Sequence, residues 1–173
     1  MIITLTEAEV STATAIGAKR EALRVSRGKG KRTPNDRGGS WLRRNAIGAI
    51  AEYAAAKHYG VLDRWLETQA YSLEHEKITA DFGSKCQLRA TDLPNGGLIL
   101  HDYDTDGPYI LALVEGSKVT LIGWMPARLA RCDAYWRATG RGFSARPAYV
   151  VPQEDLLDIN TLPMEAICGP RDA

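Results

Sequence analysis

Apolar and polar positions along the chain predict helices at its beginning and strands through its middle. Alanine-rich stretches with few strong breakers predict helices over residues 7–26 and 40–60. Apolar or alternating runs bounded by turn residues predict strands over 85–91, 98–100, 109–115, 118–124 and 146–151. Helices that flank a run of adjacent strands indicate an α/β or α+β fold with a mixed central β-sheet, in one domain over residues 1–173.

Capping and turn residues predict where several elements end. Thr6 and Glu9 have the spacing of a capping box, and Ser40 and Gly60 are suited to begin and end the second helix. Gly116, followed by a serine, predicts a hairpin turn. In the last third we expect a helix over 126–136, a loop over 137–144, a strand near a sheet edge over 146–151 and a short terminal helix after 151. Residues 61–78 fit a helical extension at their start and a strand entry at their end.

The predicted strand over 85–91 carries the most distinctive chemistry. Its apolar and polar positions alternate, which is typical of a half-buried strand. The apolar positions are Cys86, Leu88 and Ala90, and the polar ones are Gln87, Arg89 and Thr91. Asp81 lies just upstream, before a turn signal at Gly83 and Ser84. The stretch therefore gathers an acid, an amide and a guanidinium, which are groups that bind metal ions or phosphates.

One charged residue interrupts the packed face of the helix over 40–60. Helical spacing places five residues on one stripe, which are Asn45, Gly48, Glu52, Ala55 and Tyr59. Glu52 is the only charge on a stripe that is otherwise small or aromatic. A buried carboxylate is costly unless it is paired or bound to a metal, so Glu52 needs a partner. A metal ion shared with Asp81 would be one.

The order of these motifs resembles the PD-(D/E)XK nuclease superfamily. The superfamily pattern is a helix with a Glu, an Asp that begins a strand, and Glu-or-Gln-x-Lys on the paired strand. The matching residues here are Glu52, Asp81 and Gln87-Leu88-Arg89. The chain over roughly residues 40 to 152 is also similar to small exonuclease-like proteins of phages and prophages, through Asn45-x-x-Gly48-x-x-x-Glu52, Asp81-Phe82-Gly83, Gln87 to Thr91, Gly97 to Leu100, Pro108 to Leu111 and Gly123-Trp124. Two departures are Gln87, where Glu is commoner, and Arg89, where Lys is usual.

The resemblance implies a restriction-endonuclease-like fold, a Mg²⁺ or Mn²⁺ cofactor and hydrolysis of DNA phosphodiester bonds. The metal ligands that it implies are Glu52, Asp81, the Gln87 amide oxygen and the Leu88 backbone carbonyl. Arg89 cannot act as a base, but it can hold a phosphate bidentately and stabilise the pentavalent transition state. Lys85 is expected on the face of Gln87 and Arg89 and is a candidate substitute for the usual lysine.

Plainer explanations exist for the same residues. Glu52 could form a buried structural salt bridge with Arg89, and Asp81 could simply begin the turn at Gly83. An alternative function is therefore a catalytically inactive scaffold of this type that binds nucleic acid or a protein partner. A structural virion protein or a defence-interaction protein is a third class. The sequence is compatible with a homo-oligomer and with a phage or host protein partner, and it leaves DNA or RNA, and endo- or exonucleolytic cleavage, open.

Positive charge is concentrated in one segment. The whole chain carries a net charge of +1, but residues 19–44 carry +8 and the remainder −7. Gly and Pro content predicts a flexible basic loop over 27–39. A local basic block on an acidic protein favours contact with a polyanion, although a solvated loop is the plainer alternative. The expected DNA-contacting residues are Lys29, Lys31, Arg32, Arg37, Arg43 and Arg44.

Composition places the chain among ordinary globular proteins. Hydrophobic residues make up 45% and charged residues 25%. No apolar run is long enough to span a membrane, and the first residues lack the features of a signal peptide. The three cysteines are widely spaced and form no CxxC pair, so neither a disulfide framework nor a zinc cluster is indicated. We therefore expect a cytoplasmic protein that does not associate with membranes.

Overall fold

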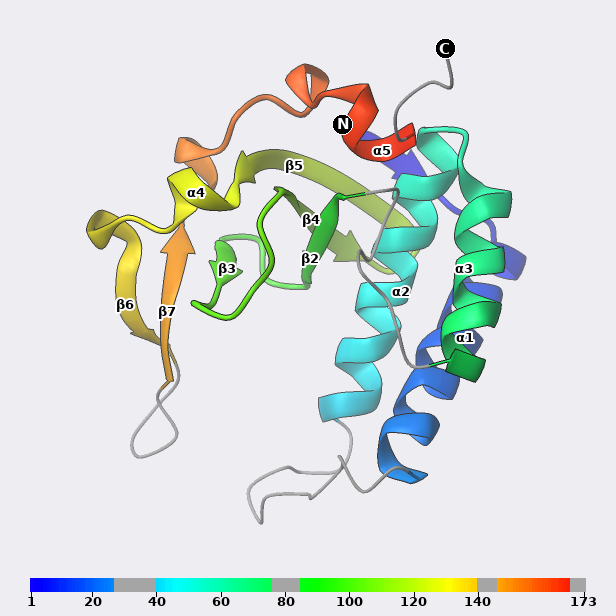
Figure 1. The fold of residues 1–173 in the computed structure, drawn as a ribbon. Helices are drawn as coiled ribbons and strands as arrows, with labels where there is room; N and C mark the ends of the chain where they lie inside the picture. Colours follow the sequence, from blue (N-terminus) through cyan, green and yellow to red (C-terminus); the bar gives the residue numbers. More distant parts are fainter. Residues whose placement is uncertain (27–39, 76–84, 140–145, 169–173) are drawn as a thin grey trace.

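The computed structural model of the protein describes residues 1–26, 40–75, 85–139 and 146–168, which form an α+β fold (Figure 1). The α-helices of these ranges are α1 (Glu7–Ser26), α2 (Ser40–His58), α3 (Leu62–His75), α4 (Ala127–Ala130) and α5 (Met164–Cys168). The strands of the same ranges are β1 (Ile2–Thr4), β2 (Gln87–Thr91), β3 (Leu98–Leu100), β4 (Pro108–Glu115), β5 (Lys118–Pro126), β6 (Trp136–Thr139) and β7 (Arg146–Val151). None of the helices described is long and apolar enough to cross a membrane.

The described strands form two sheets. In the first the order is β1-β5-β4-β2, with β2 parallel to β4 and the other neighbours antiparallel, so the predicted mixed sheet is confirmed. The second sheet is antiparallel, with the order β3-β7-β6, and its existence was not predicted. Strand β7 lies between two neighbours in this second sheet. The predicted position of residues 146–151 near an edge is therefore wrong.

Strand β4 separates two hydrophobic cores. Successive side chains of a strand point to opposite faces of its sheet. Ile110 and Ala112 point into the first core, which lies against α1, α2 and α3. Tyr109 and Leu111 point into the second core, which includes residues of β3 and β7. The helices therefore cover one face of the first sheet, and the second sheet packs on the side of its other face (Figure 1).

Helices α1 and α2 pack closely and run antiparallel. Lys57 near the end of α2 forms an ion pair with Glu9 near the start of α1, at 2.7 Å. At the opposite end, the Asn45 side-chain amide donates to Glu21 at 2.8 Å. Gly17 allows the close approach between them, because a Cβ at this position would lie 2.6 Å from the Asn45 backbone oxygen. The pairing brings the end of α1 and the start of α2 to the same end of the molecule (Figure 1).

Helix α2 also runs antiparallel to β2. Near its start, Arg43 forms an ion pair with Asp92, just after β2, at 2.6 Å. Just beyond its end, Tyr59 lies close enough to Cys86, just before β2, to be influenced by it electrostatically. Glu52 stands between these two contacts along α2, so it lies level with the middle of β2.

Local signals in the sequence were confirmed where neighbouring residues set the structure. The backbone N–H of Thr6 donates to Glu9 Oε2 at 2.8 Å, and the N–H of Glu9 donates to Thr6 Oγ1 at 3.3 Å, which is the predicted capping box. The predicted hairpin between β4 and β5 turns at Gly116, which has a φ of +66°. The helix predicted over 126–136 is wrong beyond its first residues, because α4 ends at Ala130. Strand β1 is not predicted by the sequence, and α3 continues much further than the helical extension expected at the start of residues 61–78.

Candidate functional site

The Glu52 carboxylate is buried where α1, α2 and α3 meet. Arg20 of α1 donates to both of its oxygens, from Nη1 to Oε1 at 2.9 Å and from Nη2 to Oε2 at 2.6 Å. Trp65 of α3 donates from Nε1 to Oε2 at 3.1 Å. Arg20 also donates from Nε to Gln69 Oε1 at 2.9 Å, and its Nη2 bonds to the same oxygen. Glu52 therefore has the partner that burial requires, and the cation of this ion pair is Arg20, not Arg89.

The polar residues of β2 point away from these helices. Gln87 pairs in register with Tyr109, and Arg89 pairs with Leu111. Both of these β4 residues belong to the second core, so Gln87 and Arg89 lie on that face of the first sheet. Gln87 is buried, whereas Arg89 is half-buried and forms an ion pair with Asp104 at 3.1 Å. The guanidinium of Arg89 also lies 5.2 Å from the centroid of the Tyr109 ring.

The structure therefore does not bring Glu52 together with Gln87 and Arg89. The side chain of Leu88 packs in the first core, on the α2 side of the strand. Lys85 is exposed just before β2, and its backbone N–H donates to the Ala166 carbonyl at 3.2 Å.

The same residues offer few free ligands for a metal ion. Asp81, the other acidic ligand that the resemblance implies, lies outside the described residues. No group of three or more His, Cys, Asp or Glu side chains in the described part of the chain could hold a metal ion. The donors of Glu52 already occupy both of its oxygens. Glu52 thus does not fit the role of metal ligand that the resemblance implies for it.

The described parts of the +8 segment, residues 19–26 and 40–44, lie at one end of the helix pair. Ser26 ends α1 and Ser40 begins α2 at this end (Figure 1). Arg43 and Arg44 are exposed in the first turns of α2. The remaining expected DNA contacts lie outside the described residues, and these are Lys29, Lys31, Arg32 and Arg37.

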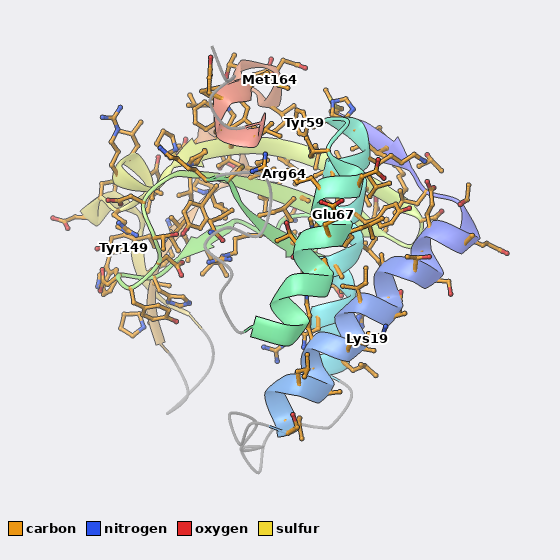
Figure 2. The ribbon with its side chains drawn as sticks, turned by 45° about the vertical axis from the view of Figure 1, so that its right-hand side comes forward. Lys19, Tyr59, Arg64, Glu67, Tyr149 and Met164 are labelled. Atoms are coloured by element: carbon orange, nitrogen blue, oxygen red, sulfur yellow. The ribbon has the colours of Figure 1, made fainter. Side chains whose placement is uncertain are left out.

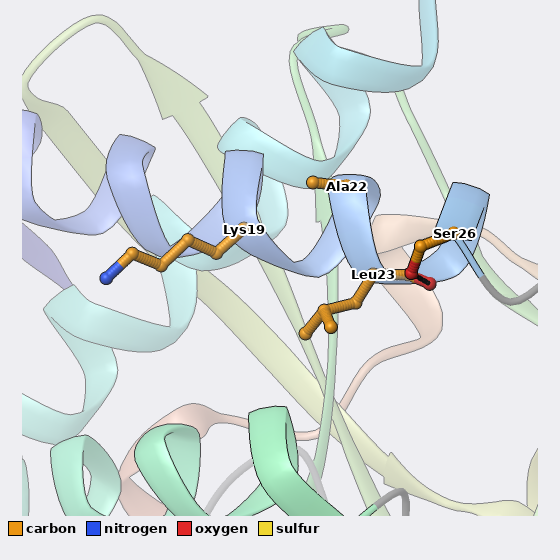
Figure 3. Close-up of a pocket in the computed structure, with 4 residues that line it drawn as sticks. All are labelled: Lys19, Ala22, Leu23 and Ser26. Atoms are coloured by element: carbon orange, nitrogen blue, oxygen red, sulfur yellow. Dashed lines mark hydrogen bonds between the residues drawn. The ribbon is translucent and has the colours of Figure 1, made fainter.

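A surface pocket lies at the same end of α1. It has a volume of about 420 Å³, and the described residues that line it, Lys19, Ala22, Leu23 and Ser26, come from the last two turns of α1 (Figure 3). The Ser26 hydroxyl donates to the Leu23 carbonyl at 2.9 Å and so satisfies a carbonyl at the helix end. Lys19 brings a cation to this surface. The basic end therefore combines cationic and apolar side chains. Tyr149 of the second sheet lies on the opposite side of the molecule from Lys19 (Figure 2).

Sequence reasoning missed the residues that surround Glu52. Ala13, Gly17 and Arg20 share one stripe of α1 by helical spacing, so Arg20 could have been placed on its packed face. No comparable signal identifies Trp65 or Gln69, because the sequence leaves the secondary structure of residues 61–78 open between helix and strand. No family model matches the chain, and no curated protein or solved structure was found to be similar to it.

Proposed function

We propose that the protein binds DNA through the basic end of the α1–α2 helix pair. One observation supports this proposal above others: the antiparallel pairing places the two described parts of the +8 segment, residues 19–26 and 40–44, at the same end of the molecule. The rest of the chain is acidic, so the positive field is local. Such a field attracts the phosphate backbone of DNA, and each phosphate contact releases condensed counterions.

Not every cation of the segment is available for phosphate contacts. Arg20 is committed to Glu52 inside the helix junction. Arg43 pairs with Asp92, but its side chain is 72% exposed, so it can reach a phosphate by exchanging one anion for another. The proposed contacts are Lys29, Lys31, Arg32, Arg37, Arg43 and Arg44.

Binding to a short DNA duplex over a series of salt concentrations tests the proposal. We expect wild-type affinity to fall steeply with salt and a variant with Lys29, Lys31, Arg32 and Arg37 all changed to Gln to bind more weakly. Its logarithmic salt slope should be lower by about 0.9 for each phosphate that the variant no longer neutralises. Lys118→Gln, at the exposed β4–β5 hairpin, is the matched control and should leave the slope unchanged. Failure of the wild type to bind, or identical slopes in wild type and quadruple variant, would refute the proposal.

As a second candidate we propose metal-dependent hydrolysis of DNA on a restriction-endonuclease-like core. It is favoured by the shared face of Gln87 and Arg89, because an amide and a guanidinium on one strand can both contact a phosphate. Asp81 would supply the acid. Linear, circular and single-stranded DNA should then be cut with Mg²⁺ or Mn²⁺ and not with a chelator, and Asp81→Ala should abolish cutting. A wild type that binds all three substrates without cutting any would leave the binding function alone.

A further inference from the structure

We infer that Glu52 is a structural clamp that holds three helices together and does not ligate a divalent cation. The resemblance in sequence assigns the same carboxylate to a metal ion. A structural clamp and a metal ligand differ in the expected effect of replacing Glu52 on folding stability. Arg20, Glu52, Trp65 and Gln69 form this helix junction. The clamp acts on folding stability, which is measured independently of DNA binding.

The acceptor capacity of Glu52 is nearly used up by protein donors. A carboxylate offers about four acceptor positions, and Arg20 and Trp65 fill three of them. The two Arg20 contacts form a bidentate, charge-assisted pair, which is the strongest common geometry for these groups. The side chain of Glu52 is only 6% exposed and that of Arg20 22%. Little room and little solvent are therefore left for a hydrated cation.

A metal ion on Glu52 would have to displace Arg20. A divalent cation and a guanidinium on one carboxylate repel each other, and burial strengthens the repulsion. The displaced guanidinium would also lose its bonds to Gln69. This exchange would remove the bonds by which Arg20 of α1 holds Glu52 of α2 and Gln69 of α3. A metal site at Glu52 is therefore incompatible with the packed helix junction.

The position of Glu52 relative to the sheet supports the same conclusion. Its carboxylate bonds to residues of α1 and α3, whereas Gln87 and Arg89 lie on the face of the sheet that belongs to the second core. Leu88 lies between Gln87 and Arg89 on β2, and its side chain packs in the first core, on the opposite face of the sheet. A cation bound by Gln87 would thus be on the other side of the sheet from the helices that surround Glu52.

The melting temperature of Glu52→Gln relative to wild type, measured in the presence of a chelator, distinguishes a structural clamp from a metal ligand. For a clamp, Glu52→Gln leaves Arg20 as a buried unpaired cation, and the melting temperature should fall by roughly 6–20 °C. For a metal ligand, loss of one of several clustered acids relieves repulsion in the metal-free protein, so the melting temperature should rise or stay unchanged. Glu67→Gln, an exposed glutamate of α3 (Figure 2), is the matched control and should stay within about 2 °C of wild type.

Two further measurements keep the test decisive if Glu52→Gln folds poorly. The double variant Glu52→Leu with Arg20→Met replaces the pair by apolar groups and should recover most of the lost melting temperature, because no charge is left unpaired. Any stabilisation of wild type by Mn²⁺ should persist in this double variant. A double variant that melts no higher than Glu52→Gln, or that loses a Mn²⁺ stabilisation seen in wild type, would overturn the inference.

Discussion

The guanidinium of Arg89 lies over the ring of Tyr109, 5.2 Å from its centroid, and at the same time pairs with Asp104 at 3.1 Å. The Tyr109 hydroxyl donates to the Thr105 carbonyl at 3.0 Å, and Asp104 accepts from the backbone N–H of His101. Strand β2 and the loop after β3 are thus joined through one side chain. Arg89 has a structural task here whether or not it also contacts a phosphate.

Arg89→Ala should therefore destabilise the protein without any substrate present. Loss of a partly exposed ion pair and a cation–π interaction together costs about 1–2 kcal/mol, or roughly 2–8 °C in melting temperature. Arg89→Lys should fall between wild type and Arg89→Ala, because it keeps the charge but not the planar guanidinium. Thermal melts of the three proteins measure this order. An Arg89→Ala protein that melts at or above the wild-type temperature would contradict a structural role.

Two glycines on the helix pair should respond oppositely to the same substitution. A Cβ on Gly17 would meet the Asn45 backbone at 2.6 Å, so Gly17→Ala must push α1 and α2 apart and should cost about 1–3 kcal/mol. A Cβ on Gly48 would meet nothing within 4 Å. Gly48→Ala should therefore stabilise α2 by roughly 0.5–1 kcal/mol, because alanine is the better helix former.

Chemical denaturation of both variants measures these changes directly. Because both substitutions add one methyl group to the same helix pair, each serves as the control for the other. A stabilised Gly17→Ala protein would show that the close approach of the two helices is not required.

The sequence predicted those parts of the fold that neighbouring residues determine. The capping box of α1 and the hairpin at Gly116 depend on residues within a few positions of each other, so both could be recognised locally. The helix predicted over 126–136 failed because tertiary pairing prevailed over local preference. Trp136 pairs with Tyr149 across β6 and β7, and their ring centroids lie 4.7 Å apart.

The candidate site was predictable only in part, for the same physical reason. The burial of Glu52 followed from its helical stripe, and its need for a partner followed from the cost of a buried charge. The identity of the partner did not follow, because Arg20 lies 32 residues away on another helix. The sides taken by Glu52 and Gln87 depend on how α2 packs on the sheet, and no local pattern in the chain encodes that packing.

Tyr59 should make stability depend on pH in the alkaline range. Burial, with a smaller contribution from Cys86, raises the pKa of Tyr59 from 10.0 to about 12. The unfolded chain therefore loses this proton more readily than the folded protein. The stabilising contribution of the neutral phenol is complete below pH 10 and is lost progressively as the pH rises from 10 to about 12.

Replacing Tyr59 by Phe tests this pH dependence. Melting temperatures of wild type and Tyr59→Phe should follow parallel curves below pH 10 and diverge above it, with wild type falling more steeply. Tyr103→Phe removes a hydroxyl from an exposed ring and is the control. Curves for Tyr59→Phe and wild type that stay parallel up to about pH 12 would show that Tyr59 is not the group responsible.

Asp92 should weaken DNA binding by competing for Arg43. The two side chains form a surface ion pair at 2.6 Å beside the basic end of α2, where DNA is proposed to bind. Asp92→Asn removes a negative charge and releases Arg43 for a phosphate, so affinity should rise several-fold at low salt. The salt slope should become steeper by about 0.9, which corresponds to one additional phosphate contact.

A second variant separates the release of Arg43 from a general change in charge. If Arg43 makes the new contact, the double variant Asp92→Asn with Arg43→Gln should lose the steeper slope; a slope that stays steep would exclude Arg43 as the source.

Glu115→Gln changes the net charge by the same amount at the β4–β5 hairpin. That hairpin contacts the chain just before α1, where the backbone N–H of Leu5 donates to the Ser117 carbonyl at 2.9 Å. From there the 20 residues of α1 span about 30 Å to the basic end. Because this distance exceeds the screening length of about 8–10 Å at physiological salt, Glu115→Gln should leave DNA affinity nearly unchanged. Equal gains from Asp92→Asn and Glu115→Gln would show that DNA responds to total charge and not to the basic end of the helix pair.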